Sequence, residues 1–114
     1  MFADDDEDAL LKRHRYVLQE IEREIRKINR EVIHRDIARI ERSDITDLAR
    51  VVAEHRARYL QAGMRLAKAS VGSPEEQEMV RALPDLRREF ESTRDVFAAL
   101  ERAIEQAYVD IELR

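Results

Sequence analysis

The sequence predicts an all-α protein, folded as an elongated, coiled-coil-like antiparallel three-helix bundle. Apolar side chains recur at alternating intervals of three and four residues through most of the 114 positions. This spacing places them on one face of a helix. The composition agrees, because 40% of the residues are charged, 5% are aromatic, and Gly and Pro contribute only two residues each. Such a composition favours long helices over sheets.

The first predicted helix covers residues 8–42. Its apolar stripe, which we call the seam, consists of Leu11, His14, Leu18, Ile21, Ile25, Ile28 and Val32. Beyond the seam the stripe shifts to Ile33, Ile37 and Ile40, and such a shift can mark a change of packing partner. Residues 1–7 form an acidic segment that is either disordered or caps the helix, since negative charge suits the positive end of a helix dipole.

The second predicted helix covers residues 44–70. Ser43 and Asp44 are good N-cap residues, and Gly72 is placed as the residue after the C-terminal cap. The stripe of this helix again follows the three-and-four spacing, with Ile45, Leu48, Val52, His55, Tyr59, Ala62, Leu66 and Ala69. We expect this face to pack against the two other helices.

The third predicted helix covers residues 74–112 and has the strongest start signal in the chain. Ser73 is the N-cap, Pro74 occupies the first helical position and Glu76 completes a capping box. Pro84 falls inside the helix and removes one backbone hydrogen bond, so the helix is kinked or broken there. We favour a kink, because the stripe keeps its phase through Met79, Leu83, Leu86, Phe90, Thr93, Phe97, Leu100, Ile104 and Ile111.

The length is that of one domain, residues 1–114, and the charge is divided unevenly along it. Residues 10–42 hold ten basic and six acidic residues, whereas residues 73–114 hold six basic and eleven acidic residues. We interpret this asymmetry as attraction between helices of the bundle. Nucleic-acid binding through the basic first helix is a less favoured alternative, because acids are interleaved with the bases and no aromatic platform accompanies them.

The end of the third helix is the candidate interface. Short turns make neighbouring helices antiparallel, and the third helix then extends past the turn between the first two. Leu100, Ile104, Tyr108 and Ile111 would project beyond the three-helix body as an exposed apolar stripe. A stripe of this kind is expected to bind a second copy or another protein, with Tyr108 as the anchor.

A cluster of acidic residues and histidines gives a metal-binding or catalytic alternative. Glu31 and His34 have the Glu-x-x-His spacing of ferritin-like di-iron bundles. In the antiparallel arrangement His55 lies opposite residue 30 and opposite Glu89, so Glu31, His34, His55 and Glu89 could converge. A second Glu-x-x-His is absent. A histidine at a seam position is more often a polar core residue that sets helix register.

The remaining sequence features exclude several classes of function. Without cysteines there are no disulfides and no thiolate metal sites. The acidic first residues do not fit a signal peptide, and no apolar run approaches the length of a membrane span. We therefore expect a cytoplasmic, non-catalytic interaction or regulatory module without a cofactor. It would form a homo-oligomer, such as a dimer, or bind another protein.

Overall fold

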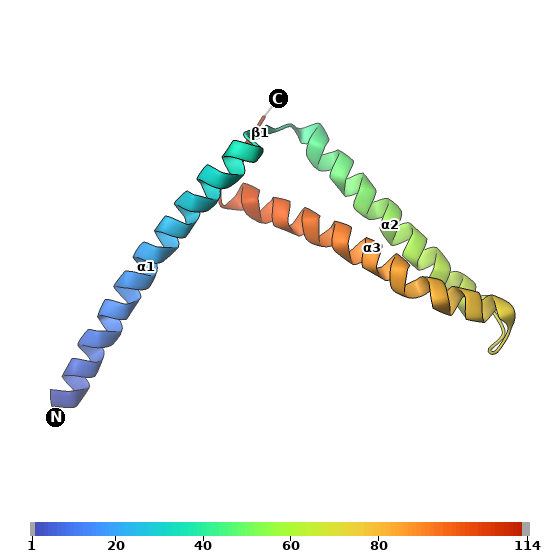
Figure 1. Ribbon diagram of the computed structural model, residues 1–114, viewed down its shortest axis with the longest axis horizontal. Helices are drawn as coiled ribbons and strands as arrows, with labels where there is room; N and C mark the ends of the chain where they lie inside the picture. The colour runs from blue at the N-terminus through green and yellow to red at the C-terminus, as the bar shows by residue number, and fades with distance from the viewer. Residues whose placement is uncertain (1, 113–114) are drawn as a thin grey trace.

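The computed structural model describes residues 2–112 and confirms an elongated all-α fold (Figure 1). Its helices are α1 (Phe2–Asp36), α2 (Arg42–Lys68) and α3 (Pro74–Glu105). Two short strands, β1 (Arg39–Ile40) and β2 (Asp110–Ile111), pair in parallel. The molecule measures 72 × 49 × 19 Å, so it is long in two directions and thin in the third.

Helices α2 and α3 form an antiparallel hairpin. The rings of Tyr59 and Phe90 stack with their centroids 6.2 Å apart, and Nδ1 of His55 lies 3.6 Å from Oε2 of Glu89. The sequence-based expectation that His55 lies opposite Glu89 is therefore confirmed. Val52 and Ala62 are the buried residues of α2, which shows how thin the core of a two-helix unit is.

A tight turn closes the hairpin. The amide of Ser73 donates to the carbonyl of Ser70, and Gly72 has a φ of 85°, which glycine adopts without steric cost at the third position of a β-turn. Helix α2 is capped at Ala69, so Gly72 lies three residues beyond the cap and not directly after it. The amide of Glu76 donates to Oγ of Ser73, which confirms the predicted cap of α3.

The start of α2 differs from the prediction by two residues. Its N-cap is Glu41, whose amide donates to Oδ2 of Asp44 over 2.8 Å. Ser43 and Asp44 therefore lie inside the first turn and are not the N-cap. The acidic side chain still satisfies a free amide at the helix start, but from the third helical position, as in a capping box.

Helix α3 runs through Pro84 without a break and ends at Glu105, seven residues before the predicted end. The amide of Tyr108 donates to the carbonyl of Ala103, and the amide of Ala107 donates to that of Ile104. With Ala107 at a φ of 57°, these bonds form a Schellman motif. The helix stops here although alanine, unlike glycine, disfavours this conformation.

Helix α1 lies apart from the hairpin and is not a third parallel layer beside it (Figure 1). It begins at Phe2, so residues 2–7 are helical, and it ends at Asp36 rather than near residue 42. The chain then becomes extended, and Ile40 pairs with Ile111. Ile40 and Val109 are buried at 7% and 5% exposure. We call this junction, residues 30–40 with residues 103–112, the apex.

Candidate interaction surface

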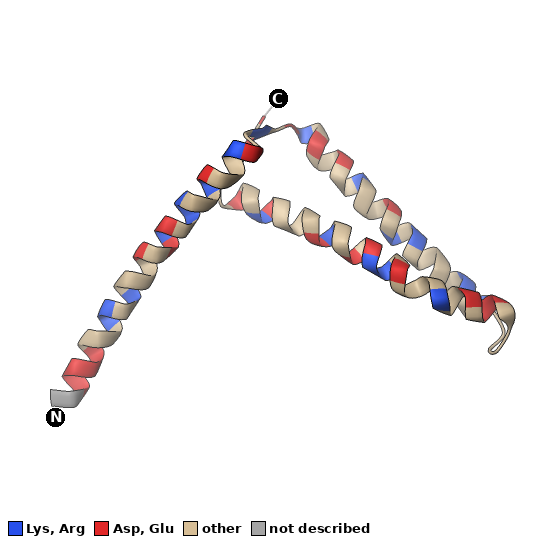
Figure 2. Cartoon of the chain, in the orientation of Figure 1, with Lys and Arg blue, Asp and Glu red and all other residues tan. Residues whose placement is uncertain are grey.

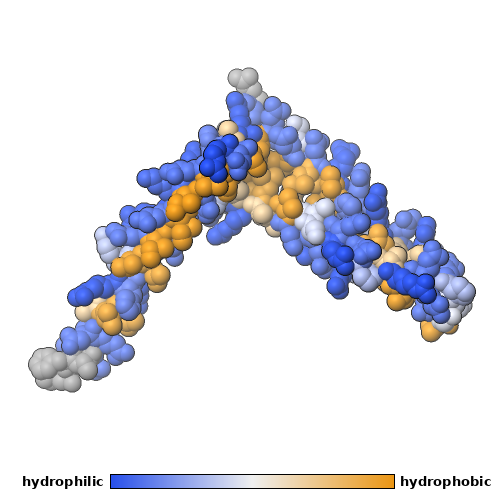
Figure 3. Space-filling model, viewed as in Figure 1, coloured by the Kyte–Doolittle hydropathy of each residue, from blue (hydrophilic) through white to orange (hydrophobic). Residues whose placement is uncertain are grey.

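The seam of α1 is exposed along its whole length. Its apolar residues are 43–57% exposed: Leu11, Leu18, Ile21, Ile25, Ile28 and Val32. Leu10 and Val17 lie beside the seam and are 49% exposed. Figure 3 shows the resulting apolar band along α1. A contiguous apolar band of this kind on a monomer marks an interaction site.

Acidic and basic residues alternate along most of α1 (Figure 2). Asp4 and Asp5 stand in the first turn, and His34 and Arg35 in the last. This placement suits the helix dipole, which favours acids at the N-terminus and bases at the C-terminus. The helix is therefore well formed by its own sequence, although its apolar face has no partner within residues 2–112.

Polar contacts at the apex attach only the last turns of α1 to the rest of the chain. Arg30 donates to the carbonyl of Ala107 and pairs with Asp110. Nε2 of His34 lies 3.2 Å from Oδ2 of Asp110, and Arg39 pairs with Glu112. The hydrogen bond with His34 lowers the pKa of Asp110, the charge of Arg30 lowers it further, and desolvation opposes both.

An apolar groove of about 430 Å³ lies at the apex. It is formed where α1, β1, α2, α3 and the segment after α3 meet. Its lining residues are Ile33, Ile37, Ile40, Asp44, Leu48, Val96, Ala99, Leu100, Ala103 and Val109. The shift of the apolar stripe after Val32 is thus explained, because these later residues of the first stripe contact the apex while the seam does not.

The four residues predicted as the interface do not share one helical face. Leu100 and Ile104 belong to α3, whereas Tyr108 and Ile111 follow its end. All four are partly buried, and Leu100 lines the apex groove. The overhanging helix that suggested them is absent within residues 2–112, because α3 ends at Glu105. Their contact with a partner stays a prediction.

The four metal candidates divide into two places. His55 and Glu89 face each other across the hairpin, whereas His34 contacts Asp110 at the apex, on the same helix as Glu31. Within residues 2–112, no group of three or more His, Asp or Glu side chains is placed to hold a metal ion. Nδ1 of His55 is buried and has no hydrogen-bond partner among residues 2–112. This environment is that of a polar residue in the core of the hairpin.

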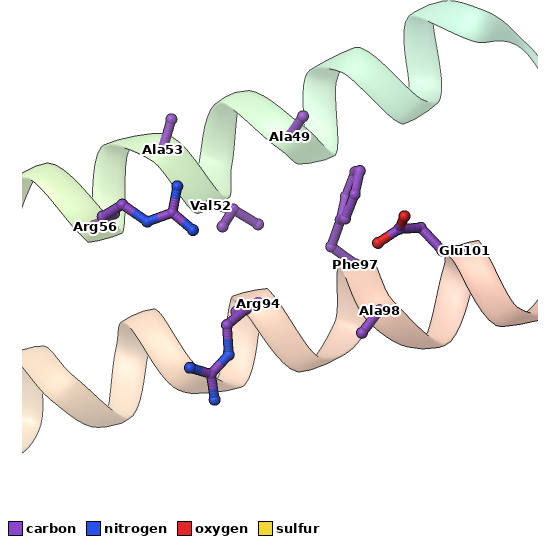
Figure 4. Close-up of a pocket in the computed structure, with 8 residues that line it drawn as sticks. All are labelled: Ala49, Val52, Ala53, Arg56, Arg94, Phe97, Ala98 and Glu101. Atoms are coloured by element: carbon purple, nitrogen blue, oxygen red, sulfur yellow. The ribbon is translucent and has the colours of Figure 1, made fainter.

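A shallow groove of about 310 Å³ runs between α2 and α3 (Figure 4). Arg56 and Arg94 line it, and their guanidinium carbons lie 5.1 and 5.5 Å from the centroid of the Phe90 ring. Cation–π contacts of this kind favour the packed hairpin. Arg56 therefore contacts α3 from α2, whereas Arg94 contacts Phe90 within α3, and nothing further in the groove indicates a ligand.

The apex residues Val109, Asp110 and Arg30 were missed by the sequence-based reasoning. A signal for the short strand exists in the alternation of apolar and acidic residues from Val109 to Glu112, which has the period of a strand. Ile111 also fits the helical spacing, which instead predicts that the third helix continues through this segment. Asp110 and Arg30 have no local signal, because their partners are 76 to 80 positions away.

Comparisons with protein families, with curated proteins and with solved structures found no match. Among the helices of residues 2–112, none combines the length and the apolar character that crossing a membrane requires. The surface of the molecule is the basis on which its function can be inferred.

Proposed function

We propose that this chain is a non-catalytic helical interaction module that pairs through the seam of α1 with another helix. The observation that carries the proposal is the seam itself, an apolar stripe in strict heptad spacing whose residues are about half exposed. Heptad spacing sustained over three repeats is typical of helices that pack against other helices. The interface is thus proposed on α1, in addition to the C-terminal residues Leu100, Ile104, Tyr108 and Ile111.

The energetics support pairing. Most helical stability in proteins comes from packing of the apolar face, and full burial of a Leu or Ile side chain contributes about 1.5–3 kcal/mol. Helix α1 gains little of this within its own chain. A second helix along the seam would bury five such side chains together with that of Val32. No observation in residues 2–112 favours the metal-binding or the nucleic-acid alternative over this proposal.

The test is the oligomeric state in solution, measured by sedimentation from micromolar to millimolar concentration. We expect the wild-type chain to self-associate and Ile21→Asp to be monomeric, since the variant places a charge in the middle of the seam. The matched control is Tyr16→Asp, because Tyr16 is 58% exposed on the opposite face of the same helix. A wild-type chain that remains monomeric throughout, or a control as defective as Ile21→Asp, contradicts the proposal.

A further inference from the structure

The heptad positions of α1 define which residues would flank a paired seam. Counting Leu11 as position a, the a positions are Leu11, Leu18, Ile25 and Val32, and the d positions are His14, Ile21 and Ile28. Flanking e positions hold Arg15, Glu22 and Asn29, and flanking g positions hold Leu10, Val17, Glu24 and Glu31. In coiled coils, the charges at e and g set the partner and its orientation.

Resting on the proposed function, we propose that the seam binds a second copy of this chain, with the two α1 helices antiparallel. The pairing has a single register, in which Leu18 of one copy faces Ile21 of the other. Leu11 then faces Ile28, and His14 faces Ile25. Six seam layers form in this register, four of them wholly apolar, and they extend over about 26 Å at 1.5 Å per residue.

Charge complementarity selects the antiparallel direction. Antiparallel helices bring e positions beside e positions, so Arg15 of each copy meets Glu22 of the other, which gives two interchain ion pairs. Asp4 also occupies an a position, one heptad before Leu11, and it lies level with Arg35 of the second copy. Parallel helices would instead bring g beside e, so Glu31 would meet Asp36 of the second copy and the two acidic segments of residues 4–8 would lie together.

Charge also selects the register. If the overlap of the two helices is shifted by one heptad towards their C-terminal ends, Glu22 of one copy lies beside Glu22 of the other, and Glu24 lies beside Glu24. A shift in the other direction places Arg15 beside Arg15 and Glu7 opposite Ile25. Like charges in facing positions are destabilising, and an acidic side chain in a seam layer costs desolvation. The register with Leu18 facing Ile21 avoids these like-charge contacts, and it places Glu7 only at the end of the seam, opposite Val32.

The direction is tested by electron-spin distance measurements on the full chain. The sequence has no cysteine, so Ala9→Cys and Arg23→Cys can each be labelled at one site. Both residues lie at f positions, opposite the seam. The antiparallel register predicts an axial separation of roughly 32 Å for the Ala9 labels and roughly 10 Å for the Arg23 labels. A parallel dimer gives equal distances at both sites.

The register is tested by exchanging charges. Arg15→Glu would weaken dimerisation about tenfold, because two attractive pairs become repulsive. Adding Glu22→Arg to that variant would restore the dissociation constant to within about threefold. The matched control is Arg13→Glu, which makes the same charge change at a c position, away from the seam, and is expected to change dimerisation less than about threefold.

Each outcome separates this inference from the proposed function. Unequal label distances together with rescue by Glu22→Arg support the antiparallel dimer. A dimer that Ile21→Asp disrupts, but whose two label distances are equal or whose charge exchange fails to rescue, overturns the inference and leaves the proposed function intact. A monomeric wild-type chain refutes the proposed function itself.

Discussion

Helix α1 and the α2–α3 hairpin have the same kind of apolar pattern, but the apolar faces are covered in the hairpin and exposed in α1. The stripes of α2 and α3 face each other, with Tyr59 stacked on Phe90 and Val52 buried. The seam of α1 follows the same three-and-four spacing, yet its residue Leu18 remains 57% exposed. Spacing therefore determines which face of a helix is apolar, and it does not determine which surface covers that face.

The connections between the helices explain the difference. Residues 69–73 form a tight turn that returns the chain along α2. Residues 39–41 are instead extended, and Ile40 is held by pairing with β2 and by burial. This connection directs α2 away from α1, so the seam has no hairpin partner. The direction of the chain after each helix decides whether its stripe is covered within the same molecule.

The largest expected difference in the free energy of unfolding is between two variants, each of which truncates one apolar residue in one of the two regions. Phe90→Ala removes a ring that contacts Tyr59, Arg56 and Arg94, so it should lower the free energy of unfolding by about 2 kcal/mol. Leu18→Ala should change it by less than about 0.5 kcal/mol at concentrations where the chain is monomeric. Urea denaturation followed by circular dichroism measures both.

The same pair of variants sharpens the comparison when the protein concentration is raised. Leu18→Ala should then become destabilising, because the wild-type residue is buried only in the associated state. The effect of Phe90→Ala should not depend on concentration. If Leu18→Ala is as harmful as Phe90→Ala in dilute solution, the seam is covered within one chain and the contrast between the regions is wrong.

A smaller effect is expected at the turn that makes the hairpin. Ser73→Ala removes the side-chain oxygen that accepts from the amide of Glu76 over 3.1 Å, and loss of such a cap costs about 1 kcal/mol. Ser43→Ala is the control, because Ser43 is not the N-cap of α2. Equal losses of unfolding free energy in the two variants would contradict the assigned caps.

The smallest expected effect concerns the attachment of α1 at the apex. The pKa of Asp110 lies below its ordinary value of 3.8, mainly because of the hydrogen bond with His34. A lowered pKa in the folded state contributes stability that is present above pH 3.8 and is lost as the pH falls through the lower, folded-state pKa. The apex contact should therefore persist at neutral pH and weaken only in acid.

Carboxyl chemical shifts in an NMR titration follow this contact directly. His34→Ala should raise the pKa of Asp110 towards its ordinary value, since the main cause of the shift is removed. Arg35→Ala serves as the control, because Arg35 pairs with Asp36. An unchanged Asp110 pKa in His34→Ala would show that the contact does not hold the carboxylate in solution.

The sequence predicted those features that depend on neighbouring residues. The start of α3 at Ser73, Pro74 and Glu76 follows from local backbone and side-chain chemistry, and so do the long helices and the pairing level of His55 with Glu89. The apolar face of α1 was also predicted, but as part of a three-helix bundle, whereas in the structure its seam is about half exposed. In each case the deciding interactions lie within a few residues or follow from one short turn.

The features that were missed depend on distant contacts. At the end of α3, Ala107 adopts a left-handed conformation, and no glycine at this position signals it in the sequence. The cost of this conformation is offset by burial of Val109 and by the contact of Asp110 with His34. The early end of α1 likewise depends on the strand that Ile40 pairs with. Apolar residues beyond the ends of α1 and α3 keep the helical spacing. Spacing alone therefore predicted that both helices continue further than they do.

The pairing of β1 with β2 has a consequence for the order of folding. His34 and Asp110 are 76 positions apart, whereas α1 and the hairpin turn form from contacts between near neighbours. Because long loops close more slowly than local structure forms, both helical regions can be complete before the apex closes. During synthesis α1 would then exist for a time as a free arm, able to meet another α1 before its angle to the hairpin is set.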